Sequence, residues 1–160
     1  MASYMYQPSR WLRVKQALFV EDATSLTHTA TFTIPAGSTL LDIVVTPIVL
    51  WTPTTSAALV VGDANSANGW FQSTNLVATD LVLGERYQAS NDNNWGGLNG
   101  AYLTTAGRFG QQATNMIGGY CPNAYSVIGV VTVVGPSTAV GRTLMTVIYM
   151  KGQKVTPVLA

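Results

Sequence analysis

Two stretches of the chain decide its fold class: residues 27–51 read THTATFTIPAGSTLLDIVVTPIVLW, and residues 125–150 read YSVIGVVTVVGPSTAVGRTLMTVIYM. Each contains two runs rich in β-branched and apolar residues, separated by a short segment with Pro, Gly and Ser. Runs of this kind, bounded by turn-forming residues, are typical of β-strands joined in hairpins. The two stretches therefore predict an all-β domain.

The rest of the chain extends this pattern. Residues 26–34 alternate between threonine and mostly apolar side chains, which is the period of a half-buried strand. Further strands are expected at residues 39–51, 56–62, 70–71, 76–83, 125–135 and 141–150. Together they predict a β-sandwich or a jelly-roll-like barrel of roughly eight strands.

Three regions of different character follow from this assignment. We expect an extended N-terminal arm over residues 1–25, in which the only weak helical period lies at residues 9–19. The β-domain is expected over residues 26–150, with a folded excursion of irregular structure at residues 84–124. Residues 151–160 are expected to form an extended tail.

The composition indicates a protein that works in contact with others. Charged residues make up 9% of the chain, against about 25% in an average soluble domain. A surface with so few charges is poorly protected against association. We interpret the chain as a subunit of an assembly; the alternative is a monomeric β-domain with a neutral Asn/Thr surface.

The few charges are unevenly placed. Residues 1–20 carry three basic residues and no acidic one, the last ten residues carry two basic residues and no acidic one, and the body between them has three basic and seven acidic residues. Basic ends on an acidic body favour contact with an acidic neighbour, and five charges split between two ends are too few for a nucleic-acid-binding arm. Trp and Arg are also frequent at the energetic centres of interfaces. The residues expected to anchor the chain to a neighbour are Arg10, Trp11, Arg13, Lys15, Lys151 and Lys154.

Catalytic residue types are scarce. His28 is the only histidine and Cys121 the only cysteine. A nucleophile needs a base within hydrogen-bond reach, and the chain has no G-x-S-x-G motif to present a serine. We predict that the protein is not an enzyme and that it carries no cofactor and no metal.

Two loops have residue types that occur in binding sites. Residues 63–69, DANSANG, partly match a calcium loop, but Ala67 stands where a ligand is needed and no Glu closes the loop. Asp and Asn in such a loop are better explained as turn formers that bond to their own backbone. Residues 91–94, with Trp95, have the residue types of a sugar site, and equally those of a loop beside a buried tryptophan.

The sequence also bears on the compartment. A single cysteine leaves no intrachain disulfide, which fits folding in a reducing cytoplasm. The N-terminus lacks the pattern of a secretory signal. The longest apolar run, residues 40–51, contains Asp42 and Pro47 and is too short to span a bilayer. We therefore expect no membrane partner.

The pattern of strands and turns resembles the small β-rich head proteins of tailed bacteriophages. The resemblance covers residues 25–150 and includes IPAG at residues 34–37, LVVGD at residues 59–63, GAYL at residues 100–103 and the final strand at residues 143–149. It consists of a general pattern and includes no diagnostic motif. It implies a decoration, or cement, protein that is made in the host cytoplasm and lies on the capsid exterior of the virion. The partners that it implies are the major capsid protein and two further copies of the chain in a homotrimer.

Two other functions remain open at this point. A phage tail or fibre module, or a lectin-like domain, would use Trp95, Tyr102 and residues 91–94 to hold a glycan. A jelly-roll coat protein would assemble the shell itself.

Overall fold

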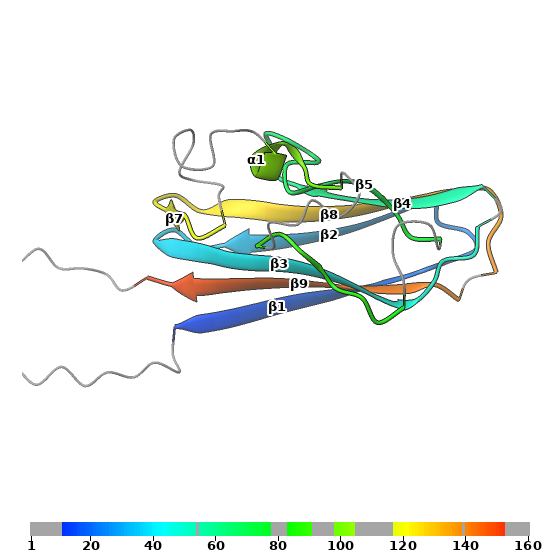
Figure 1. The fold of residues 1–160 in the computed structure, drawn as a ribbon, viewed down its shortest axis with the longest axis horizontal. Helices are drawn as coiled ribbons and strands as arrows, with labels where there is room; N and C mark the ends of the chain where they lie inside the picture. Colours follow the sequence, from blue (N-terminus) through cyan, green and yellow to red (C-terminus); the bar gives the residue numbers. More distant parts are fainter. Residues whose placement is uncertain are drawn as a thin grey trace, which may run out of the picture.

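The chain folds into two antiparallel β-sheets that face each other (Figure 1). The computed structural model describes residues 11–53, 55–77, 83–90, 98–104, 117–138 and 140–152. Within these ranges the elements are β1 (Leu12–Val20), β2 (Thr27–Ile34), β3 (Ser38–Val49), β4 (Ser56–Gly62), β5 (Phe71–Asn75), β6 (Tyr87–Gln88), α1 (Ala101–Thr104), β7 (Tyr120–Cys121), β8 (Tyr125–Val134) and β9 (Arg142–Lys151).

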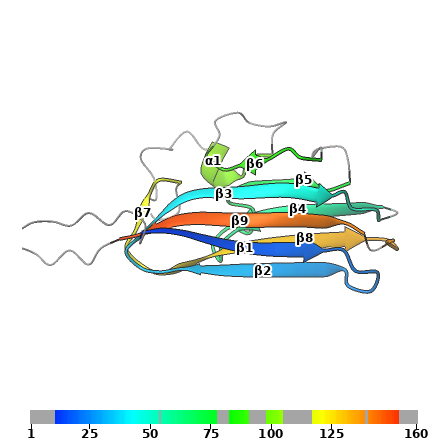
Figure 2. The ribbon, with the colours of Figure 1, turned by 90° about the horizontal axis from the view of Figure 1, so that it is seen from below.

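The strand order shows how the chain is wound. One sheet, sheet A, has the order β1-β9-β3-β6, with β7 paired to the start of β3, and the other, sheet B, has the order β2-β8-β4-β5. With β7 left aside, each strand of the first half pairs with its counterpart from the second half: β1 with β9, β2 with β8, β3 with β6 and β4 with β5. The domain is thus one long antiparallel hairpin, rolled so that its strand pairs alternate between the two sheets (Figure 2).

This topology confirms the all-β sandwich and corrects the way its strands are joined. The strands predicted at residues 26–34, 56–62 and 125–135 agree with β2, β4 and β8 to within a residue at each end. The predicted hairpins are wrong, because β2 and β3 lie in different sheets, and so do β8 and β9. An alternating pattern reports that a strand buries one face, but it does not say which strand lies beside it.

The N-terminal region also differs from expectation. An arm without regular structure was expected over residues 1–25, yet β1 pairs with β9 along nine residues, and Phe19 is buried in the core. The sequence did not predict this strand because apolar side chains lie on both of its faces, so hydrophobicity does not alternate with a clear period of two. At the other end, β9 includes Lys151, where the tail was expected to begin, and residues 153–160 lie outside the described ranges.

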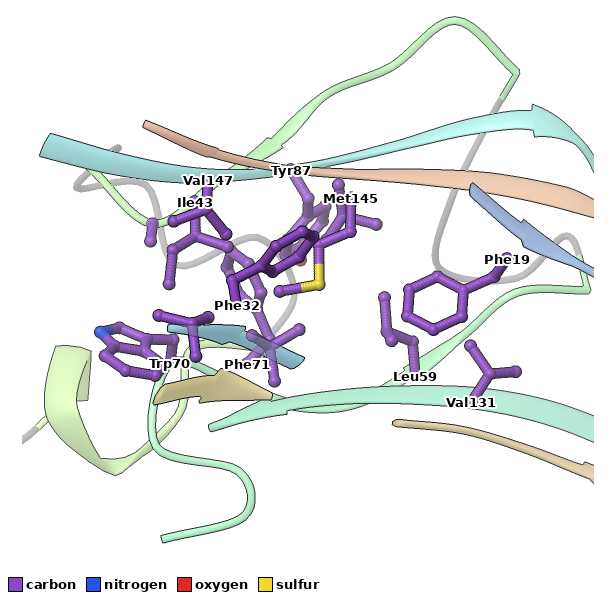
Figure 3. Packing of buried hydrophobic residues seen from close by; sticks show 14 of the residues in the cluster. Phe19, Phe32, Ile43, Leu59, Trp70, Phe71, Tyr87, Val131, Met145 and Val147 are labelled. Atoms are coloured by element: carbon purple, nitrogen blue, oxygen red, sulfur yellow. The ribbon is translucent and has the colours of Figure 1, made fainter. Parts of the chain in front are cut away.

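The core fills the space between the sheets. Sheet A contributes Phe19, Met145 and Val147, and sheet B contributes Leu59 and Val131, all at most 4% exposed (Figure 3). The expected excursion at residues 84–124 includes β6, α1 and β7 in its described parts. Of the strand expected at residues 76–83, residues 76–77 form a turn and residues 78–82 lie outside the described ranges.

A buried carboxylate joins three connections at one end of the sandwich. Glu21, which follows β1, is 2% exposed. Its Oε2 accepts hydrogen bonds from the backbone N–H groups of Gly141 at 2.8 Å and Val140 at 3.3 Å, and its Oε1 accepts one from Thr52 at 3.1 Å. Because these donors come from the β8–β9 and β3–β4 connections, Glu21 holds both of them against the end of β1.

These contacts set the protonation of Glu21. Burial by itself raises the pKa of the carboxyl, but hydrogen bonds from the Ser137 side chain and from the backbone of Gly141, Thr52 and Val140 outweigh it and lower the pKa. A lowered pKa in the folded state means that the ionised carboxylate stabilises the fold. This contribution is complete above the unfolded-state pKa and is lost as the pH falls through the folded-state value.

We predict that Glu21→Gln lowers the free energy of unfolding at pH 7 by about 1–3 kcal/mol, because the amide puts donors against the backbone N–H groups. The variant should also lose less stability than the wild type between pH 5 and pH 3. Urea denaturation across this pH range measures both effects, with Glu85→Gln as the control for the same chemical change elsewhere. Equal pH dependence in Glu21→Gln and the wild type would contradict this role.

Candidate interaction surface

The outer face of sheet A carries an aliphatic strip. Along β1, Leu12, Val14, Leu18 and Val20 point away from sheet B and are 44–54% exposed. Residues opposite one another in an antiparallel pair point to the same side, so Leu144, Ile148 and Met150 of β9 lie beside them. We call these seven residues the aliphatic face: Leu12, Val14, Leu18, Val20, Leu144, Ile148 and Met150.

One polar pair interrupts the aliphatic face at its middle. Gln16 lies opposite Thr146, and the Gln16 side-chain amide donates a hydrogen bond of 3.1 Å to the Thr146 hydroxyl. The two polar groups therefore partly satisfy each other. This allows the surrounding apolar surface to be covered by another protein at a smaller desolvation cost.

The outer side of β2, an edge strand of sheet B, is different. Thr27, Thr29, Thr31 and Thr33 of β2 are all exposed on it. We call these four residues the threonine face. Since β1 and β2 are both terminal strands in their sheets, the aliphatic character of one outer face does not follow from its position at a sheet edge.

Lys15 closes the side of the sandwich between β1 and β2. It points inward from β1, and its Nζ donates a hydrogen bond of 2.8 Å to the Thr33 carbonyl of β2. The same ammonium lies 6.0 Å from the centre of the Tyr149 ring. An inward-pointing lysine at a sheet edge discourages the addition of a further strand. Both contacts that the structure shows for the Lys15 ammonium are with residues of the same domain.

Three of the other predicted anchors meet at one end of sheet A. The Trp11 carbonyl accepts a hydrogen bond of 2.8 Å from the Lys151 backbone N–H, and Arg13 lies opposite Tyr149 with its side chain exposed. The start of β1 and the end of β9 lie together at this end of the domain (Figure 1). Arg10 and Lys154 lie outside the described residues.

Sequence reasoning selected the basic residues of this region and missed the aliphatic face. A signal was present: residues 12, 14, 18 and 20 are all aliphatic and share one parity, as do residues 144, 148 and 150. This signal does not predict a surface by itself, because the inner and outer sides of a strand cannot be assigned without the partner sheet.

The Asp63 loop is organised by its own hydrogen bonds. Asp63 Oδ1 accepts from the backbone N–H groups of Asn65 at 2.8 Å and Ser66 at 2.9 Å, which confirms its interpretation as a turn former. The Tyr102 hydroxyl also donates to Asp63 Oδ1, at 2.9 Å, and the Tyr102 ring packs edge-on against Trp70. Tyr102 is therefore engaged in packing. Residues 91–94 and Trp95 lie outside the described ranges.

The two residues considered for catalysis are far apart. His28 is half-buried near the start of β2 and packs edge-on against Trp51 at a ring distance of 5.6 Å. Cys121 is buried beyond the other end of β2, where its carbonyl accepts a hydrogen bond from Gly37. The six residue steps from His28 to Ile34 span about 20 Å of strand, so the fold does not join these groups in one site. Among the described residues, no group of three His, Cys, Asp or Glu side chains is placed to hold a metal.

Comparison with known proteins gives two structural likenesses. The fold is similar to a chain in the acidic stable capsid structure of Helicobacter pylori bacteriophage KHP30, with a TM-score of 0.48 and 10% identity over 88% of this chain and 87% of that one. It is also similar to a chain in the cyanophage Pam1 capsid asymmetric unit, with a TM-score of 0.48 and 19% identity over 94% and 91% of the two chains. No protein-family model matches the sequence, and no curated protein is similar to it. In the part of the chain that the structure describes, no helix is long and apolar enough to cross a bilayer.

We predict that Lys15→Met lowers the free energy of unfolding by about 1 kcal/mol, because it removes the hydrogen bond to Thr33 and keeps most of the aliphatic stem. Lys151→Met, at the exposed end of β9, should change stability by less than about 0.5 kcal/mol. Urea denaturation of both variants measures the difference. An equal effect at the two positions would show that the contact between Lys15 and Thr33 adds nothing to the fold.

Proposed function

We propose that this chain is a structural virion protein, a decoration protein of a bacteriophage capsid. It sits as a homotrimer on the capsid exterior, binds the lattice of the major capsid protein and stabilises the joints between capsomers. The observation that carries the proposal is a sheet with surfaces for assembly: sheet A of a chain with only 9% charged residues carries the aliphatic face, and a basic group with Trp11, Arg13 and Lys151 at one end. Such a surface calls for a protein partner, since large exposed apolar patches mark interaction sites.

The winding of the chain supports this class of function. We interpret the hairpin rolled into two facing sheets, with β1 paired to β9 and β2 to β8, as a jelly-roll winding. Jelly rolls serve in viral capsid proteins and in lectins. The sugar-binding alternative is less favoured because Tyr102, one of its predicted contacts, donates its hydroxyl to Asp63 and packs on Trp70.

The placement of charge supports a contact through the chain ends. Trp11, Arg13 and Lys151 lie at one end of sheet A, and Arg10 and Lys154 adjoin them in the sequence. A basic, Trp-containing group suits an acidic protein surface. Five basic residues at the ends of an acidic body do not suit nucleic acid, and the proposal includes neither a membrane partner nor a catalytic activity.

The physical basis of the role is linkage. A protein that binds the assembled lattice and not its separated subunits stabilises the lattice by mass action. A trimer makes three such contacts at once, and the second and third form at a high effective concentration. Weak single contacts therefore add up to tight binding on a shell, while a free capsid subunit is bound weakly.

We predict that the full chain co-sediments with empty shells assembled from the major capsid protein of the same genome. Deletion of residues 1–10 should weaken this binding at least about tenfold, because part of the basic end is lost. The deletion stops before β1, since removal of residues 1–20 would also take Phe19 out of the core.

The control is Thr31→Ala on the threonine face, which should bind shells like the wild type. Two results would overturn the proposal. One is a full chain that stays in the supernatant at every shell concentration. The other is a purified chain that assembles into closed particles on its own, which would make it the coat protein.

A further inference from the structure

We infer that the aliphatic face is the surface through which copies of this chain contact one another in solution. The inference rests on the trimer of the proposed function and deepens it, because it assigns the self-contact to one face of sheet A. The capsid contact stays with the basic chain ends.

The first argument is the size of the surface. The seven side chains form two adjacent rows on β1 and β9, and the four on β1 are about half exposed. They present on the order of 500 Å² of apolar area, near the upper end of what a monomer exposes in one patch. A stable protein contact covers about 800 Å² on each partner, with an apolar centre and a polar rim. The aliphatic face has the size of such a centre, and the rim is supplied by neighbours such as Thr39 and Thr46 of β3.

The second argument is the distribution of charge. Symmetry brings the same residues of each copy together near the axis, so a charged residue there would be repelled by the like charge of the next copy. The central pairs of the aliphatic face carry none: Leu12 lies opposite Met150, Val14 opposite Ile148, Gln16 opposite Thr146 and Leu18 opposite Leu144. Charges lie beside these pairs and not among them: Arg142 lies opposite Val20 at the start of β9, and Asp42 of β3 lies opposite Ile148, where its carboxylate accepts hydrogen bonds from Ser90. This neutrality fits contact with an identical surface.

The third argument is the contrast with β2. That strand also ends its sheet, yet its outer face carries threonines. An edge strand that only faces water has no need of Leu12, Val14, Leu18 and Val20. The contrast holds between the two edge strands, since the outward row of β8 beside β2 includes Ile128 and Val130. We therefore assign the protein contact to the edge strand whose outer side is aliphatic, which is β1.

The experiment inserts a charge into the aliphatic face. Light scattering on the full chain should give a mass near three times 17.0 kDa. Leu18→Lys and Val14→Lys should raise the concentration at which the trimer dissociates more than about tenfold, because like ammonium groups would meet at the contact. Thr29→Lys and Thr31→Lys place the same charge on exposed positions of β2 and should leave the mass unchanged.

Folding of each variant is checked by far-UV circular dichroism, and Val14→Thr provides a milder change of similar shape. A monomeric wild type would overturn the inference, and so would a Leu18→Lys variant that stays trimeric. A third contrary result is a Leu18→Lys variant that has the mass of the wild type but no longer binds shells. This result would show that the aliphatic face contacts the capsid and not another copy of the chain. A truncated chain lacking residues 1–10 that gains mass would show that this segment covers the face, again against the inference.

The same variants separate this inference from the proposed function. A chain that is trimeric through the aliphatic face but never binds shells leaves the self-contact standing and refutes decoration. A chain that binds shells while Leu18→Lys remains trimeric refutes the self-contact and leaves decoration standing.

Discussion

The close approach of the two sheets at Gly129 is the contact on which the rest of the structure depends. A β-carbon at this position of β8 would lie 2.5 Å from the Met145 sulfur and 3.1 Å from the tip of the Phe19 ring. The missing side chain makes room for Met145 of β9 and for Phe19 of β1, both of which are buried. Phe19 enters the core here while β1 pairs with β9 in sheet A, so the outward residues of β1 and β9 form one continuous surface.

The sequence predicted the class of the fold better than its connections. Residues 26–34 alternate clearly, and residues 125–135 form a run rich in β-branched side chains, so both strands were predicted almost to the residue. Their neighbours in the sheets were not, because β2 pairs with β8 across nearly a hundred residues of chain and no local pattern records that pairing. Glu21 was missed for a similar reason, since its donors Thr52 and Gly141 are 31 and 120 residues away.

The candidate site was predicted only in part. Basic residues near the ends were recognisable from composition, and the structure brings Trp11, Arg13 and Lys151 together because β1 and β9 are neighbours. Lys15 has the same parity along β1 as Arg13, but its ammonium donates a hydrogen bond to the Thr33 carbonyl of β2, which holds this side chain against the fold. The aliphatic face could not be predicted from the sequence, because the same residues would form part of the core if the strand were turned over.

The neighbouring ends of β1 and β9 have a mechanical consequence. The two strands are antiparallel, and the chain enters at Trp11 beside the point where it leaves at Lys151. A force that pulls these two points apart opens the hydrogen bonds between β1 and β9 one after another, which is the weak direction for a β-sheet. A force that pulls both points in the same direction, away from the domain, loads the two strands in parallel and shares the strain with β3. The fold is therefore suited to being held by both ends on the same side.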